Sequence, residues 1–244
     1  MKTKIPAILT AMLLLCATVP AYATWDITSD TNIYGGFYDF INIYDTLPDH
    51  TTVNIYDVNS DYVSTYDEST LNFYDGQADI GALNFSVINM YGGDIGYIDA
   101  YNYAVVNFFE SNESTSLSAG DFTNIYVNGG SIGNLHAHQS GTIYVYSGYM
   151  TGHAGATSII TANDFSSIYI YGYDLFKTSS GGTYGYGQVY GYLTDDTYIN
   201  IDLYNSEAYD HIYLIPEPAT FALFGIGSLM LLRKNNSKNI KKHS

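Results

Sequence analysis

The sequence predicts an all-β protein with a parallel β-solenoid (β-helix) body, and three observations support this fold class. The chain is rich in strand-forming residues, with 27 Tyr and 11 Phe in its sequence. A short motif recurs at a near-constant interval, and its central residues are Asn54, Asn72, Asn89, Asn107 and Asn124. Apolar and polar side chains alternate within each copy, as in a strand with one buried face. Such repeats fit coils that pack only against their neighbours.

Residues 1–23 have the features of a secretory signal peptide. Lys2 and Lys4 precede an apolar stretch, and small residues at the −3 and −1 positions, Ala21 and Ala23, predict cleavage after Ala23. Cys16, the only cysteine of the chain, lies in this leader, so neither disulfides nor thiol chemistry is expected in the body. A lipoprotein modified at Cys16 is the less favoured alternative, because Leu15 stands where a small residue is usual.

Two interleaved repeats organise the body, which we expect over residues 24–213. The first reads VNIYD at 53, LNFYD at 71, INMYG at 88, VNFFE at 106 and TNIYV at 123, with an earlier copy, INIYD, at 41. The second begins with DIG or SIG at 79, 94 and 131. We therefore expect two short strands in each coil and about ten coils, stacked about 4.8 Å apart. An antiparallel β-sandwich is the alternative, because short alternating strands with frequent turns also fit it.

Period-two alternation assigns each strand residue to an inward or an outward column. The inward columns are apolar, and the outward ones are an asparagine column and an aromatic column. The aromatic column contains Tyr56, Tyr74, Tyr91, Phe109 and Tyr126. Aromatic rings can stack on sugar rings, so these tyrosines are a candidate glycan-stacking column. Asn and aromatic ladders also stabilise parallel coils by themselves; this role is favoured, and the two roles are compatible.

The repeats become irregular after about position 172, and the two ends of the body need covers against strand addition. We expect these caps in residues 24–34 and 174–213. Between Thr24 and Ile215 the chain has 23 acidic residues and one base, Lys177, a net charge of 1 − 23 = −22. Such a surface repels nucleic acid and anionic lipid, and it attracts cations or basic partners.

No residue pattern marks a catalytic or metal site, and we predict that the protein is not an enzyme. His136 and His138 share one face of a strand, but they align with ordinary outward positions and no third ligand is assigned. Asp45, Asp57 and Asp75 follow the aromatic residue in three copies, and a row of such carboxylates could bind calcium. A solvated acidic face without calcium is the favoured interpretation.

Besides a structural role, the sequence leaves two other functions open. A carbohydrate-active β-helix enzyme is the first, because a hydrolase needs only two carboxylates, such as Asp195 and Asp196. A lyase is disfavoured, since the body offers only Lys177 as a cation. Ice binding is the second, but threonines are scattered where a regular array would be needed.

The C-terminal segment, residues 215–244, resembles the PEP-CTERM sorting signal. The resemblance rests on Pro216, Glu217 and Pro218, then an apolar run over residues 219–232, then Arg233, Lys234 and a basic tail. It implies export by the Sec route in a Gram-negative bacterium, with recognition and cleavage by exosortase. The implied destination is the cell surface or extracellular matrix, with a structural or exopolysaccharide-associated (adhesin-like) role and a polysaccharide or matrix polymer as partner.

The length of the apolar run agrees with a temporary membrane helix. Residues 219–232 would span about 21 Å as a helix, against about 30 Å for a bilayer core. The basic tail would stay in the cytoplasm while the protein is in the inner membrane. We therefore expect a signal peptide over 1–23, the body over 24–213, the sorting signal over 214–237 and the basic tail over 233–244.

Overall fold

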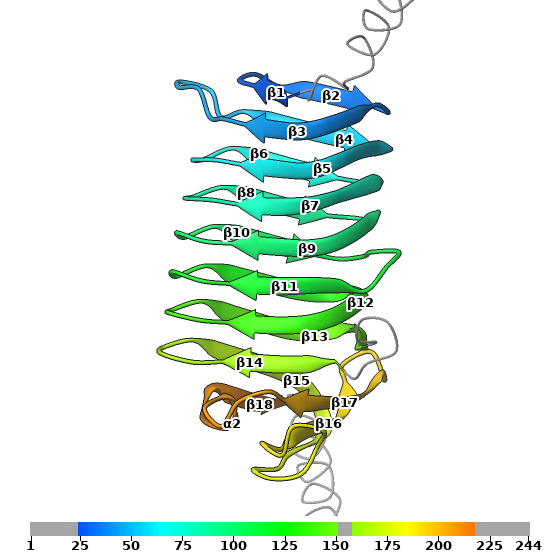
Figure 1. Cartoon of the computed structure of the whole chain (residues 1–244), viewed down its shortest axis with the longest axis vertical. Coiled ribbons are helices and arrows are strands. Elements are labelled where there is room, and N and C mark those ends of the chain that lie inside the picture. Colours follow the sequence, from blue (N-terminus) through cyan, green and yellow to red (C-terminus); the bar gives the residue numbers. More distant parts are fainter. Residues whose placement is uncertain (1–23, 151–157, 218–244) are drawn as a thin grey trace, which may run out of the picture.

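The computed structural model describes residues 24–150 and 158–217. They form an all-β parallel solenoid with almost no helix (Figure 1). The predicted fold class is therefore confirmed, and the antiparallel sandwich is wrong, because equivalent strands of successive coils pair in parallel. The estimate of ten coils is also wrong, since there are about seven turns. At least one coil is longer than the repeat indicates: Tyr144 pairs with Tyr169, whereas in an early coil Asn54 pairs with Asn72.

The strands of the solenoid lie in two stacks. The first stack, which carries the asparagine motif, contains β2 (Thr31–Tyr34), β4 (Thr52–Tyr56), β6 (Thr70–Phe73), β8 (Val87–Met90), β10 (Val105–Phe108), the first part of β12 (Asn124–Ala137), the first part of β13 (Thr142–Met150), β15 (Ser167–Lys177) and β18 (Ile212–Pro216). The second stack contains β1 (Thr24–Ile27), β3 (Phe37–Ile43), β5 (Val58–Thr65), β7 (Gly76–Ala82), β9 (Asp94–Ala100), β11 (Thr115–Ala119), the second part of β12, β14 (Ile159–Ala162) and β17 (Tyr198–Leu203).

The apolar core lies between the two stacks, where the inward side chains meet. In the first stack the predicted inward column is confirmed, and its central members are fully buried: Ile55, Phe73, Met90 and Phe108. In the second stack the last inward position before the turn is filled by alanine in five successive coils: Ala82, Ala100, Ala119, Ala137 and Ala162. A small side chain there lets the chain turn tightly into the next strand of the first stack.

Two kinds of corner connect the stacks. One corner needs glycine: at Gly76 φ is +118°, and an added Cβ would lie 2.0 Å from the carbonyl oxygen of Val58. The opposite corner is a tight turn closed by a backbone hydrogen bond, for example from Ser86 N to Leu83 O at 3.3 Å. Its second residue has a positive φ, which Asp and Asn tolerate better than most side chains. These residues are Asp67, Asn84, Asn102, Asp121, Gln139 and Asp164.

The two ends of the solenoid differ. Residues 24–34, expected as a cap, form an ordinary first coil from β1 and β2, whereas the predicted C-terminal cap is an irregular region. There β16 (Gln188–Leu193) pairs antiparallel with both β15 and β17, and α2 (Ala208–His211) is a single helical turn. Lys177 ties this region together, because its Nζ donates to the carbonyl oxygens of Tyr209 (2.7 Å) and Ile212 (2.8 Å). The only base of the body therefore has structural contacts.

Most of the predicted targeting elements lie outside the described residues. These are the signal peptide with Ala21 and Ala23, the end of the triplet at Pro218, the apolar run 219–232, and Arg233 and Lys234. Within residues 24–150 and 158–217, no helix has the length and apolar character needed to cross a membrane. Pro216 and Glu217 are described: Pro216 ends β18, and Glu217 N donates to Gly172 O at 3.0 Å.

Candidate functional site

The outward asparagines of the first stack form a hydrogen-bonded ladder. Each side-chain amide donates from Nδ2 to Oδ1 of the asparagine one coil earlier, at 2.8 Å in every step. An interior member such as Asn72 therefore both donates and accepts, and its amide polar groups are satisfied along the solenoid axis. The ladder consists of Asn32, Asn54, Asn72, Asn89 and Asn107.

Beside this ladder runs the predicted aromatic column, which begins one coil earlier than expected, at Tyr34. Its centroid distances are 4.7–5.3 Å and its interplanar angles 3–14°, so the rings stack face to face along the axis: Tyr34, Tyr56, Tyr74, Tyr91 and Phe109. Each interior ring has both faces covered by its neighbours, while ring edges and hydroxyls face solvent. A sugar ring cannot stack on these covered faces. The geometry supports the stabilising role of the column, and a ligand would meet its hydroxyls.

Tyr126 does not belong to the aromatic column, and its assignment there is wrong. The repeated motif aligned Asn124 with Asn107, whereas the strands pair Asn107 with Tyr126 and Val105 with Asn124. Tyr126 therefore continues the asparagine column. From there the column is aromatic, with centroid distances of 5.0–5.3 Å between successive rings: Tyr126, Tyr144, Tyr169 and Tyr213.

A cluster of tyrosines and histidines lies on the outer face of the second stack. His136 pairs with Ser118, which pairs with Asp99, so its expected outward position is confirmed. Burial raises the pKa of Tyr101 to about 12, and Asp99 adds to the shift. Burial lowers the pKa of His136, with a smaller contribution from His138. In the described parts of the chain, no group of three or more His, Cys, Asp or Glu side chains is placed to hold a metal ion.

The three aspartates considered for calcium do not form one row. Asp57 and Asp75 lie at the same corner, where Asp57 N donates to Asp75 O at 3.0 Å. Asp45 follows β3 in the second stack and therefore lies at the opposite corner, where its Oδ1 accepts from Thr51 N at 3.0 Å. The copy INIYD at 41 matches the motif of the first stack, but it belongs to the other stack.

Asp195 and Asp196, considered for hydrolysis, are held by contacts in the turn between β16 and β17. Asp195 accepts from Gly148 N at 3.3 Å and from Thr197 N at 3.1 Å. Asp196 accepts from the Tyr173 hydroxyl at 2.7 Å, and this bond is the largest cause of the rise in the pKa of Tyr173 to about 12. Both carboxylates thus have contacts that order the C-terminal region.

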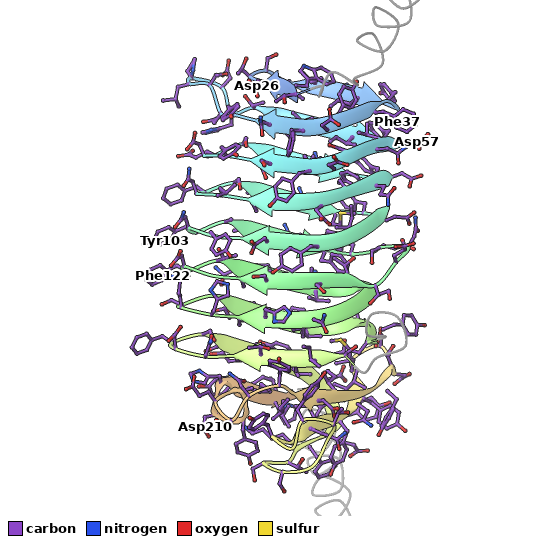
Figure 2. The ribbon with its side chains drawn as sticks, in the orientation of Figure 1. Asp26, Phe37, Asp57, Tyr103, Phe122 and Asp210 are labelled. Atoms are coloured by element: carbon purple, nitrogen blue, oxygen red, sulfur yellow. The ribbon has the colours of Figure 1, made fainter. Side chains whose placement is uncertain are left out.

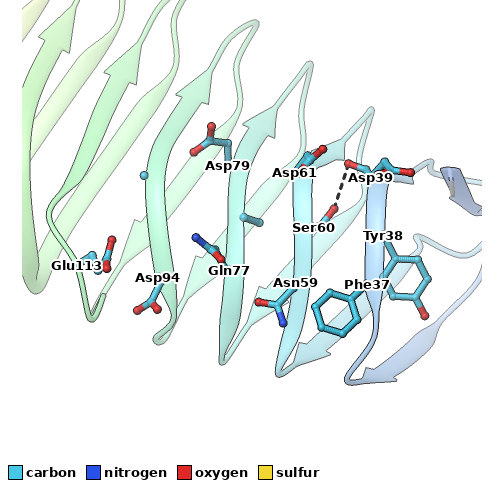
Figure 3. A pocket seen from close by; sticks show the side chains of 12 residues that line it. Phe37, Tyr38, Asp39, Asn59, Ser60, Asp61, Gln77, Asp79, Asp94 and Glu113 are labelled. Atoms are coloured by element: carbon cyan, nitrogen blue, oxygen red, sulfur yellow. Dashed lines mark hydrogen bonds between the residues drawn. The ribbon is translucent and has the colours of Figure 1, made fainter. Parts of the chain in front are cut away.

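An acidic groove of about 700 Å³ crosses four successive strands of the second stack, β3, β5, β7 and β9, and extends to Glu113 just before β11 (Figure 3). Phe37 and Tyr38 lie at its N-terminal end, and amide side chains and carboxylates line the rest: Asp39, Asn59, Asp61, Gln77, Asp79, Asp94 and Glu113. Phe37 is 85% exposed. Sequence reasoning missed this groove, although Asp39, Asp61 and Asp79 come from β3, β5 and β7, which are neighbours in the second stack.

We also compared the chain with known proteins. No protein-family model matches it. The search of curated proteins and the search of solved structures likewise gave no significant match.

Proposed function

We propose that the protein is an exported structural rod of the cell surface or extracellular matrix, and that its acidic groove holds an extended polysaccharide. The groove carries this proposal. It crosses four coils, which at the usual strand spacing is about 14 Å between the outermost strands. Carboxylate and amide oxygens can accept hydrogen bonds from sugar hydroxyls, and the exposed ring of Phe37 offers an apolar surface for a sugar ring.

The route to the surface is part of the same proposal. Signal peptidase would act after Ala23, and exosortase would read Pro216, Glu217 and Pro218. The position of the triplet supports this division of roles. β18 completes the last parallel pairing with β15, and the triplet begins at its final residue. Cleavage C-terminal to the triplet would therefore leave the described strands intact. In a host with exosortase, replacing Pro216–Pro218 by Ala should leave the tail attached; removal of the tail from that variant would overturn the sorting proposal.

Polysaccharide binding is tested on the exported protein with single variants. Phe37→Ala and Asp61→Asn should each weaken retention of the matrix polymer several-fold, measured by co-sedimentation with and without calcium. Asp67→Asn is the matched control, because it lies at the opposite corner, where Asn84 and Asn102 occupy equivalent positions. Unchanged retention in both groove variants would remove the groove from the proposal.

The carboxylates of the groove also favour a second candidate, a glycoside hydrolase. Such an enzyme needs an acid and a second carboxylate on opposite sides of a bound sugar. Asp61 and Asp79 both line the groove, each from its own coil. Release of reducing ends from polymer by the wild-type protein, abolished in Asp79→Asn, would establish the enzyme. Retention of polymer without any release would leave the binding rod.

A further inference from the structure

A second column of aromatic side chains lies at the corner made by the tight turns. Phe85 and Tyr103 stack with centroids 5.3 Å apart, and Tyr103 and Phe122 follow at 5.1 Å. In Figure 2 Tyr103 and Phe122 project from the edge of the solenoid, away from both stacks. Strand pairing of Asn124 with Thr142, and of Thr142 with Ser167, places the next two members of the column at Ser140 and Phe165. Between Phe85 and Phe165 the column is therefore aromatic except at Ser140, and Glu68 holds the same turn position in the coil before Phe85.

The tight turns do not require aromatic residues at this position. Tyr103 and Phe122 have φ values of +70° and +62°, in the left-handed region that bulky side chains avoid. Glycine would relieve this strain, which is of order 1–3 kcal/mol at each residue. The rings of Phe85, Tyr103 and Phe122 are 52–59% exposed, so they contribute little to the core. Strained and exposed aromatic residues point to a role at the surface.

Ser140 leaves an open position in this column. Phe122 and Phe165 lie two coils apart, about 10 Å at the usual strand spacing. Phe165 is 87% exposed, more than the three stacked rings, which agrees with its having no ring in the adjacent coil to cover it. A planar group at the level of Ser140 would lie about 5 Å from each ring, close to the 5.1–5.3 Å separations already present in the column. We refer to the space between Phe122, Ser140 and Phe165 as the corner slot.

The charges around the corner slot select the kind of planar group. Asp121 precedes Phe122, and Asp164 precedes Phe165, so one carboxylate flanks each side. Asp164 Oδ2 accepts from Gln139 N at 3.3 Å, which holds this carboxylate beside the turn of Ser140. The body has one base, Lys177, and that base is held at the C-terminal end. A guanidinium group is planar and cationic, stacks on aromatic rings and can pair with carboxylates.

We propose that the corner slot binds an arginine side chain of a basic polypeptide, with the guanidinium between Phe122 and Phe165 and paired with Asp121 or Asp164. The partner is a cationic segment, in keeping with the charge of −22 between Thr24 and Ile215. The proposal does not rest on polysaccharide binding, because the corner slot lies at the tight-turn corner and the acidic groove on the second stack near the opposite corner.

The direct test fills the corner slot from within. Ser140→Phe places a ring where Phe85, Tyr103, Phe122 and Phe165 have theirs, so the fold is expected to tolerate it. The full chain is titrated with a fluorescent peptide that carries three arginines and, separately, with its lysine analogue. We expect Ser140→Phe to weaken arginine-peptide binding at least tenfold, while Ser140→Ala binds like the wild type. The lysine analogue should bind several-fold more weakly than the arginine peptide, since an ammonium group is not planar.

Two further variants separate the slot from the rest of the column. Phe165→Ala should weaken binding of the arginine peptide as Ser140→Phe does, whereas Phe85→Ala, which keeps the slot intact, should not. Circular dichroism and the thermal midpoint of each variant check that the coil is retained. Equal binding by Ser140→Phe and wild type would overturn the proposal. Equal affinity for the two peptides, or displacement of the peptide by a neutral oligosaccharide, would overturn the assignment to arginine.

Discussion

The N-terminal and C-terminal halves of the first stack fill the same outward position in two ways. From β2 to β10 the position holds asparagines joined by amide hydrogen bonds of 2.8 Å. From β12 to β18 it holds tyrosines whose rings stack 5.0–5.3 Å apart. The change occurs between Asn107 and Tyr126, which pair directly. The backbone is the same parallel stack on both sides of this junction.

This difference shows what a parallel coil requires of its outward side chains. Identical neighbours about one strand spacing apart must satisfy each other along the axis. An amide does so through one directional donor and one acceptor, so replacing either of these atoms in one side chain interrupts the hydrogen-bonded ladder. A ring does so through its faces, which tolerate changes at the ring edge. The asparagine half should therefore be sensitive to charge, and the tyrosine half to loss of ring area.

The largest effect is expected for Asn72→Asp. The substitution removes the donor to Asn54 Oδ1 and places a carboxylate against that acceptor. We expect a loss of about 2–3 kcal/mol in the free energy of unfolding at neutral pH, because a polar pair becomes a repulsive one. Hydrogen exchange should show the loss in β4, β6 and β8. The loss should shrink below about pH 4, where a protonated carboxyl can donate; a pH-independent loss would contradict this explanation.

A smaller effect is expected for Tyr144→Leu in the other half. Leucine removes two ring stacks, with Tyr126 and Tyr169. We expect a loss of about 1 kcal/mol, in line with aromatic pair energies. Tyr144→Phe keeps both stacks and should cost less than about 0.5 kcal/mol, measured by urea unfolding. If Phe costs as much as Leu, the hydroxyl rather than the ring stabilises this half.

The two halves should also differ in how their contribution to stability depends on alkaline pH. Burial raises the pKa of Tyr144, with contributions from Tyr126 and Tyr169. A tyrosine whose pKa is raised by folding contributes stability that is fully present below about pH 10, its unfolded value, and is lost as the pH rises through the folded value. As the pH rises from about 9 to about 11.5, the free energy of unfolding should therefore fall less in Tyr144→Phe than in the wild type, as measured by urea unfolding. Asn72→Leu is the control. The difference in free energy of unfolding between this variant and the wild type should stay the same over that pH range, because the variant keeps Tyr144.

The smallest effect is expected at the junction itself. Tyr126→Asn removes one stack, with Tyr144, and brings a new amide beside Asn107. The lost stack and the gained hydrogen bond contribute similar free energies, so the free energy of unfolding should change by no more than about 0.5 kcal/mol. A much larger loss in thermal unfolding would show that the two ladders cannot be exchanged at this position.

Some of the site was readable from the sequence and some was not. The tight-turn repeat has a sequence signal that was overlooked: Asn84-Phe85-Ser86, Asn102-Tyr103-Ala104, Asp121-Phe122-Thr123 and Asp164-Phe165-Ser166. The open position at Ser140 becomes visible only once these turns are aligned. The acidic groove has a weaker signal, because its carboxylates come from β3, β5, β7, β9 and the segment before β11 with unequal spacing. The sequence assigned Tyr126 to the aromatic column because TNIYV at 123 matches the earlier copies of the motif.

The strand alternation and the apolar columns follow from the sequence alone, and the near-constant spacing of similar motifs favours parallel stacking, because it lets the inward side chains be buried in register. The observed strand pairing then decided between the solenoid and the antiparallel sandwich. The register at β12, by contrast, became clear only in three dimensions. A shift to the next position on the same face keeps every side chain on its side of the strand, so Asn124 and Tyr126 fit the alternation equally well. The mutual covering of the tyrosine rings also required the folded structure, because ring orientation depends on neighbours in other coils, which the alternation does not encode.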